Sequence, residues 1–147
     1  MKLPTKEGFT LIELLVVIAI ISVLAVVVFV ALNPSQRLID AKDARRTADV
    51  DTILTAIHAS IVDNKGALPT GLTTGMVEKQ LGTAAAGAAI SSGGCGVTTA
   101  AALDLSTPLV KYLKEMPIDP EGTAALTQYS VEVDANNIVT MRACGTE

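Results

Sequence analysis

Glu13 is the residue whose type and position most need a chemical explanation. It directly precedes nineteen residues without a charged side chain, Leu14 to Leu32, in which Ser22 is the only polar residue. Placing a carboxylate near hydrocarbon costs about 2.5–3.5 kcal/mol even on lenient insertion scales. Glu13 therefore needs a partner.

The apolar run that positions Glu13 has the length of a membrane span. As a helix, residues 14–32 would be about 28 Å long, close to the hydrocarbon thickness of a bilayer. A helix in a globular core would show a polar face, and this run has none. Lys2 and Lys6 precede it, which places the N-terminus in the cytoplasm and the C-terminal part of the chain outside.

The segment in front of Glu13 has a distinctive order. A short basic leader ends at Gly8, Phe9 follows it, and three residues separate Phe9 from Glu13. A Sec signal peptide instead has a shorter apolar core with its small-residue cleavage site behind it. The order found here closely resembles the class III signal of type IV pilins and pseudopilins.

That resemblance implies a defined processing chemistry. A prepilin peptidase would cut between Gly8 and Phe9 on the cytoplasmic side and methylate the new amino group, so that Phe9 becomes the N-methylated first residue. Glycine fits this cut because it allows close backbone access. Glu13 would then pair with the free amine of a neighbouring subunit. Two charges that are each costly in lipid become tolerable together, so the pairing favours docking.

The resemblance also implies partners and a location. The protein would assemble with copies of itself into a helical filament, with the help of a prepilin peptidase, an assembly ATPase and a platform membrane protein. It would begin as a single-pass protein of the bacterial inner membrane, with its C-terminal domain extracytoplasmic. It would end in a filament in the periplasm or at the cell surface.

The sequence predicts four segments and an α+β, pilin-like fold. They are a leader peptide (1–8), a transmembrane and assembly helix (9–32), an amphipathic continuation of that helix (33–65) and a small globular domain (66–147). Asn33-Pro34 predicts a kink, because proline removes a backbone hydrogen bond. Gly66 predicts the end of the helix. The long helix would pack on a small antiparallel sheet.

The continuation of the helix has two faces. An apolar stripe at spacings of three and four predicts the side that the sheet covers: Val50, Ile53, Leu54, Ile57 and Ile61. The opposite side is predicted to be solvated: Asp49, Asp51, Thr55, Ser60 and Asp63. Charges alternate in sign between Arg37 and Asp51, either as a self-paired solvated face, with pairs such as Asp43 with Arg46, or as groups that set subunit register.

The C-terminal domain is predicted to contain short helices and a hairpin. Helices are expected near 76–81, and from Thr107 as N-cap to Met116. Residues 128–133 and 138–143 alternate as strands, with a turn at 134–137 between them. The run YLKEMPIDPEG (112–122) resembles a segment frequent in major pseudopilins of type II secretion systems, although Glu121 stands where that family usually has an aromatic residue.

Two cysteines, Cys95 and Cys144, predict a disulfide in an exported domain, with two buried thiols as the alternative. Some secretion pseudopilins bind calcium in this region, and Asp119, Glu121 and Asp134 are the candidate ligands here. Calcium needs six to eight oxygens, and no EF-hand spacing is present, so we interpret these side chains as solvated turn carboxylates. No cofactor and no metal site are predicted.

Other classes of function are disfavoured. The net charge of −4 gives no concentrated basic surface for nucleic acid. His58 is the only histidine, so zinc spacings and Ser-His-Asp sites are improbable and no enzyme is predicted. The interpretation is a pseudopilin of a type II secretion-like system. The alternatives are a true type IV pilus subunit for adhesion, motility or DNA uptake and a monomeric membrane-anchored binding domain.

Overall fold

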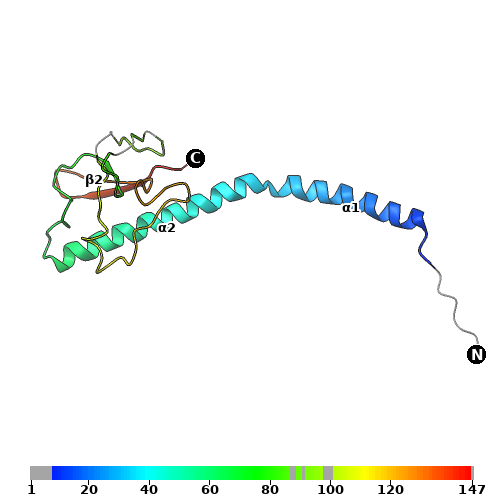
Figure 1. Cartoon of the computed structure of the whole chain (residues 1–147), viewed down its shortest axis with the longest axis horizontal. Helices are drawn as coiled ribbons and strands as arrows, with labels where there is room; N and C mark the ends of the chain where they lie inside the picture. Colours follow the sequence, from blue (N-terminus) through cyan, green and yellow to red (C-terminus); the bar gives the residue numbers. More distant parts are fainter. Residues whose placement is uncertain (1–7, 87–88, 91, 98–100, 147) are drawn as a thin grey trace, which may run out of the picture. The chain divides into compact units, whose positions relative to one another are not determined.

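The computed structural model describes residues 8–86, 89–90, 92–97 and 101–146 (Figure 1). The chain divides into two compact units, residues 1–39 and 40–147, and each is considered by itself. The predicted leader peptide lies outside the described residues except for Gly8.

Helix α1 (Leu11–Leu32) makes up most of the first unit. It is the apolar run of the sequence, and none of its residues is buried. In length and composition it is sufficient to cross a membrane. Thr10 is its N-cap, and Asn33 ends it in the left-handed conformation, with φ 40°. The interruption predicted at Asn33-Pro34 is therefore confirmed.

Helix α2 (Pro34–Asp63) resumes directly after Asn33. Proline fits the first turn of a helix because its missing N–H would have no partner there. The helix ends where the sequence predicted. Lys65 and Gly66 both have positive φ, and the Gly66 N–H donates to the Ile61 carbonyl at 2.8 Å.

Three antiparallel strands form the sheet of the second unit, in the order β1-β2-β3. The strands are β1 (Lys79–Gln80), β2 (Tyr129–Val133) and β3 (Val139–Ala143). The register between the two long strands pairs Val133 with Val139 and Tyr129 with Ala143, so the predicted hairpin is confirmed.

The core lies between α2 and one face of this sheet. Ile53 and Ile57 from the helix join Tyr129, Val131 and Val133 from β2, all five at most 1% exposed. Loop residues complete this cluster: Leu72, Met76, Leu81, Leu105 and Leu109. The fold is the predicted pilin-like α+β arrangement, a long N-terminal helix with a small antiparallel sheet packed on it.

Two predicted short helices are wrong. Residues 76–81 contain β1, because pairing with β2 satisfies more backbone groups than one helical turn can. Residues 107–116 form successive turns, in which the Leu113 N–H reaches the Leu109 carbonyl at 2.8 Å. Leu109 is fully buried, so its packing into the core decides the path of this short segment.

Burial of Ile57 can be tested against an exposed position on the same helix. Ile57→Ala should lower the free energy of unfolding by about 3 kcal/mol, because it leaves a cavity between α2 and the sheet. The matched control is Val62→Ala, whose side chain is 75% exposed, and its effect should stay within about 0.5 kcal/mol. Urea unfolding followed by circular dichroism measures both, and equal losses would contradict the assigned core.

Candidate functional site

The predicted cleavage site lies in an exposed, non-helical segment before α1. Gly8 and Phe9 are both exposed, Phe9 to 83%. A Cβ added to Gly8 would meet nothing within 4 Å, so this glycine is not required by packing. Its smallness therefore leaves the backbone open to an approaching enzyme.

Glu13 caps the helix on which it lies. Its Oε2 accepts hydrogen bonds from the backbone N–H and the hydroxyl of Thr10, each at 2.8 Å, and the Glu13 N–H donates to Thr10 Oγ1 at 3.3 Å. This reciprocal pattern is a capping box. Within the described part of the chain Oε1 accepts no hydrogen bond, so that oxygen stays available to a partner.

Thr10 is a site residue that the sequence reasoning missed. The spacing Thr-x-x-Glu before an apolar run is the signature of a capping box and was visible in the sequence. It holds the carboxylate at the helix N-terminus, where the helix dipole also favours negative charge. A hollow of about 380 Å³ borders Glu13 on the helix surface, lined by Phe9, Ile12, Val16 and Val17 as well.

A network of charges joins α2 to the loop that follows Met116. Arg46 Nε donates to Asp119 Oδ2 at 2.6 Å and Arg46 Nη1 donates to Asp43 at 2.8 Å. The side chains of Arg46 and Asp119 are 1% and 0% exposed. Lys42 pairs with Glu121 at the exposed edge of the same network. The predicted Asp43–Arg46 pair is confirmed.

Three side chains that the sequence predicts to be solvated are buried. Arg46 was assigned to a solvated helix face and Asp119 to a solvated turn, yet both are buried against each other. Ser60, also assigned to the solvated face, is 1% exposed. A pattern of charges along one helix cannot show that a loop 73 residues later supplies a buried partner.

The ion pair sets the protonation of Asp119. Burial by itself would raise the pKa of this carboxyl, but hydrogen bonds from Arg46 and from the Glu121 N–H, together with the positive charge of Arg46, hold its pKa below its usual range. The hydrogen bond to Asp119 raises the pKa of Arg46 in turn. Both groups are therefore charged at neutral pH.

The three candidate calcium ligands do not form one group. Asp119 and Glu121 lie in the network of Arg46 and Lys42, before β2. Asp134 lies beyond the other end of β2, where its Oδ1 accepts from the N–H groups of Asn136 at 2.7 Å and Ile138 at 2.8 Å. Two side-chain cations already neutralise Asp119 and Glu121.

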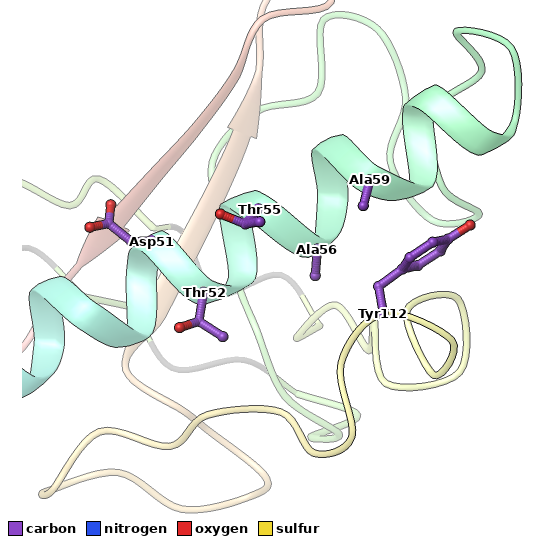
Figure 2. Close-up of a pocket in the computed structure, with 6 residues that line it drawn as sticks. All are labelled: Asp51, Thr52, Thr55, Ala56, Ala59 and Tyr112. Carbon is purple, nitrogen blue, oxygen red and sulfur yellow. The ribbon is translucent and has the colours of Figure 1, made fainter.

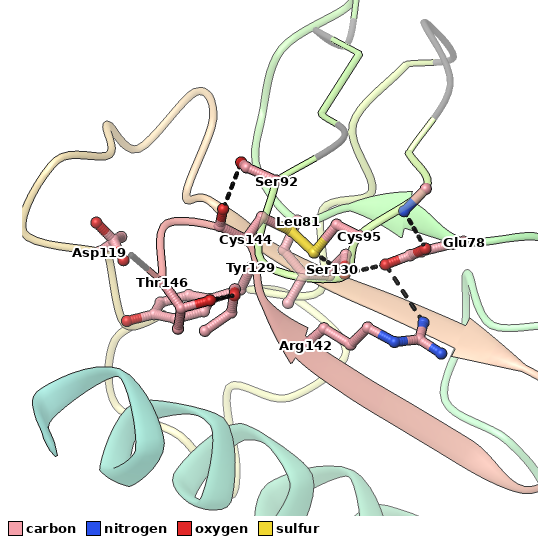
Figure 3. Close-up of a disulfide and its surroundings, with 12 residues drawn as sticks. Glu78, Leu81, Ser92, Cys95, Asp119, Tyr129, Ser130, Arg142, Cys144 and Thr146 are labelled. Atoms are coloured by element: carbon pink, nitrogen blue, oxygen red, sulfur yellow. Dashed lines mark hydrogen bonds and ion pairs between the residues drawn. A yellow bond between two sulfur atoms is a disulfide. The ribbon is translucent and has the colours of Figure 1, made fainter. Parts of the chain in front are cut away.

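The predicted disulfide between Cys95 and Cys144 is confirmed (Figure 3). It joins the Gly-rich loop to the end of β3 across 49 positions of the chain, with the Cα atoms 5.5 Å apart. A loop of this length gives about 4 kcal/mol of stabilisation in the chain-entropy model. The Ser92 hydroxyl also donates to the Cys144 carbonyl at 2.7 Å.

Along α2 the described part of the second unit has a hollow whose lining residues form no catalytic arrangement. It has a volume of about 420 Å³ and is walled by Tyr112 (Figure 2). Its other lining residues are a carboxylate and small side chains: Asp51, Thr52, Thr55, Ala56 and Ala59. His58 is exposed on α2 and does not line it.

Comparison with known proteins identifies a motif in the N-terminal segment. A protein-family model described as the prokaryotic N-terminal methylation motif matches residues 4–29. No curated protein and no solved structure matches the chain. The chain therefore carries the class III prepilin signal typical of type IV pilins and pseudopilins, on a pilin-like fold.

The buried ion pair predicts a stability difference that depends on pH. Asp119→Asn should lower the free energy of unfolding at pH 7 by about 3–5 kcal/mol, because Arg46 stays buried, loses its buried anion and keeps only the partly exposed carboxylates of Asp43 and Glu121 beside it. The folded-state pKa of Asp119 is depressed, so its contribution is present above the unfolded pKa of about 3.9 and is lost as pH falls through the folded pKa. The difference in the free energy of unfolding between the variant and the wild type should therefore become smaller below pH 4.

Urea unfolding at pH 7, 4 and 2.5 measures this difference. Asp51→Asn is the control, because Asp51 is an exposed carboxylate on the helix that carries Arg46, and its effect should stay within about 0.5 kcal/mol. If the difference in the free energy of unfolding between Asp119→Asn and wild type did not change with pH, the charge of Asp119 would not be what stabilises the fold.

Proposed function

We propose that this protein is a structural subunit of a type IV pilus-like filament, and specifically a pseudopilin of a type II secretion-like system. The observation that carries the proposal is α1, a helix of 22 residues with none buried and with one carboxylate in its first turn. The methylation motif that spans its start supports the same interpretation.

The apolar surface of α1 needs a non-aqueous environment. Its large side chains are about half to four-fifths exposed, from Val16 at 49% to Leu11 at 80%. In water this surface would be strongly unfavourable, at about 25 cal/mol for each Å². A membrane covers it before assembly, and a bundle of identical helices covers it in a filament.

Pairing of Glu13 with a neighbouring subunit favours formation of the bundle and fixes the register of its helices. The Oε2 of Glu13 is held by Thr10, and the other oxygen is open to a cation. Cleavage after Gly8 would create such a cation, the amine of Phe9, near the same end of every subunit. Pairing this amine with the Glu13 of a neighbour neutralises two charges that are each costly in lipid.

The remaining assignments follow from this proposal. Residues 1–8 are the leader, 9–32 the transmembrane and assembly helix, 33–65 its amphipathic continuation and 66–147 the extracytoplasmic domain. A prepilin peptidase, an assembly ATPase and a platform membrane protein are the partners. The N-terminus faces the cytoplasm until the subunit is extracted into the filament.

The choice of a pseudopilin rests on the small C-terminal domain and on the YLKEMPIDPEG segment at 112–122, which resembles major secretion pseudopilins. The second candidate is a true type IV pilus subunit, favoured by the same helix and motif. A monomeric membrane-anchored binding domain is the third, and it would give Glu13 no role.

Processing makes a prediction about the N-terminus. Protein purified from its native membrane should begin at Phe9 and carry one extra methyl group on its amine. Intact mass and N-terminal peptide sequencing measure both. A chain that still begins at Met1, or one that is cut after the apolar run, would overturn the proposal.

Glu13 makes a prediction about assembly. Glu13→Val should be cleaved normally at Gly8 yet form no filaments, because the neighbouring amine loses its counter-charge. Ser22→Val is the matched control, since it removes the other polar side chain of α1, whose hydroxyl donates to the Ile18 carbonyl of its own helix. It should assemble as wild type does. Electron microscopy of sheared filaments is the measurement, and normal filaments from Glu13→Val would exclude the pairing.

A further inference from the structure

A polar cluster lies on the face of the sheet turned away from α2 (Figure 3). Tyr129, Val131 and Val133 of β2 point into the core, so the residue between the first two, Ser130, lies on the opposite face. Its partner across the β2–β3 ladder is Arg142. The disulfide lies over this face.

Glu78 connects the cluster to the two cysteines. The Ser130 hydroxyl donates to Glu78 Oε1 at 2.5 Å and lies 3.3 Å from Cys95 Sγ. One carboxylate oxygen of Glu78 and the two sulfur atoms all lie within 4.8 Å of one another. The cysteines are 5% and 0% exposed, so both sulfur atoms are shielded from water, and Glu78 is partly exposed.

We propose that the reduced form of this protein binds one zinc ion through Cys95, Cys144 and Glu78. A thiol reductant converts the disulfide into two cysteine thiols and is itself oxidised to its disulfide. Zinc then replaces the two thiol protons, which pass to solvent. The metal and the disulfide are alternative links between the same two cysteines, so only one of them is present at a time.

The ligand set suits zinc. Two thiolates and one carboxylate are ligands that zinc takes, and a water molecule or the Ser130 hydroxyl completes a tetrahedron. Thiolates on one zinc ion lie about 3.8 Å apart at the usual Zn–S length. Side-chain rotation supplies this separation, because the Cα atoms of Cys95 and Cys144 are 5.5 Å apart.

The charges of the site also balance. Zinc with two thiolates and the Glu78 carboxylate carries one net negative charge. The guanidinium of Arg142 lies 3.4 Å from Glu78 Oε1 and offsets it. Burial by itself would raise the pKa of Glu78, but hydrogen bonds from Ser130 and Gly96 and the positive charge of Arg142 keep this pKa below its usual range. Glu78 is therefore an anionic ligand at neutral pH.

The loop that carries Cys95 is held by contacts that do not need the sulfur–sulfur bond. The Gly96 N–H donates to Glu78 Oε2 at 2.7 Å, and the Ser92 hydroxyl donates to the Cys144 carbonyl at 2.7 Å. Ile90 and Val97 exchange backbone hydrogen bonds across the loop. Reduction therefore leaves both thiols close to Glu78.

Cobalt and zinc titrations of the reduced full chain in detergent test the proposal. Co²⁺ should bind with one-to-one stoichiometry and give thiolate-to-cobalt charge-transfer bands, and Zn²⁺ should displace it. Zinc should also slow reoxidation of the two cysteines. The oxidised chain should give no such bands.

Two carboxylate variants decide whether the fold supplies the third ligand. Glu78→Gln should weaken cobalt binding by about 10-fold or more. Glu132→Gln is the matched control, because Glu132 pairs with the same Arg142 at 2.9 Å yet is not part of the sulfur cluster, and its affinity should stay within about twofold of wild type. Equal affinity in Glu78→Gln and wild type, or the absence of charge-transfer bands in the reduced chain, would overturn the proposal.

Folding of the reduced chain is read in the same samples. Far- and near-ultraviolet circular dichroism should show the native spectrum with zinc present. A reduced chain that is unfolded and that zinc does not refold would also overturn the proposal, because the site depends on β1 and β2 being paired.

Discussion

The structure depends on apolar surface that this chain cannot bury by itself. None of the residues of α1 is buried, and the helix is apolar on every side, so no rotation presents a polar face to water. The free energy that would stabilise a globular helix is therefore left to the lipid or to other subunits. A chain of this kind is stable in a membrane or in an assembly. Glu13 is the one charged residue of this helix.

The second unit is a small domain whose sheet is too short to stabilise it by itself. Its three strands are short, and β1 has only two residues. Much of the stabilisation comes from links between distant parts of the chain. The Arg46–Asp119 pair fixes the loop before β2 to α2, and the disulfide fixes the Gly-rich loop to the end of β3. Small domains commonly need such links because their cores are small.

Both links place polar or reactive groups in buried positions. Asp119 and Arg46 stay charged because each is the other's counter-ion. Beside the disulfide, Glu78 accepts hydrogen bonds from Ser130 and Gly96 and forms an ion pair with Arg142. The first arrangement is complete without a ligand. In the second, breaking the covalent bond between the two sulfurs leaves a set of zinc ligands, which is why redox state and metal binding are coupled there.

The sequence by itself determined the elements whose signals are local. The run of nineteen residues without a charge specifies α1, proline after Asn33 specifies the interruption, and alternation from 128 to 143 specifies the hairpin. Glu13 and Gly8 are proposed site residues because their types are unusual beside an apolar helix. The capping box of Thr10 and Glu13 is an equally local signal, although the prediction did not include it.

Only the tertiary structure shows those features that depend on contacts between distant parts of the chain. The two residues of β1 exist because β2 pairs with them, although their own spacing favoured a helix. Leu109 holds its segment in turns through burial in the core. Arg46 and Asp119 looked solvated, and so did Ser60, because a helical pattern records periodicity and not which distant loop covers a face. Burial is a property of the packed chain, so no local pattern could have placed these residues inside.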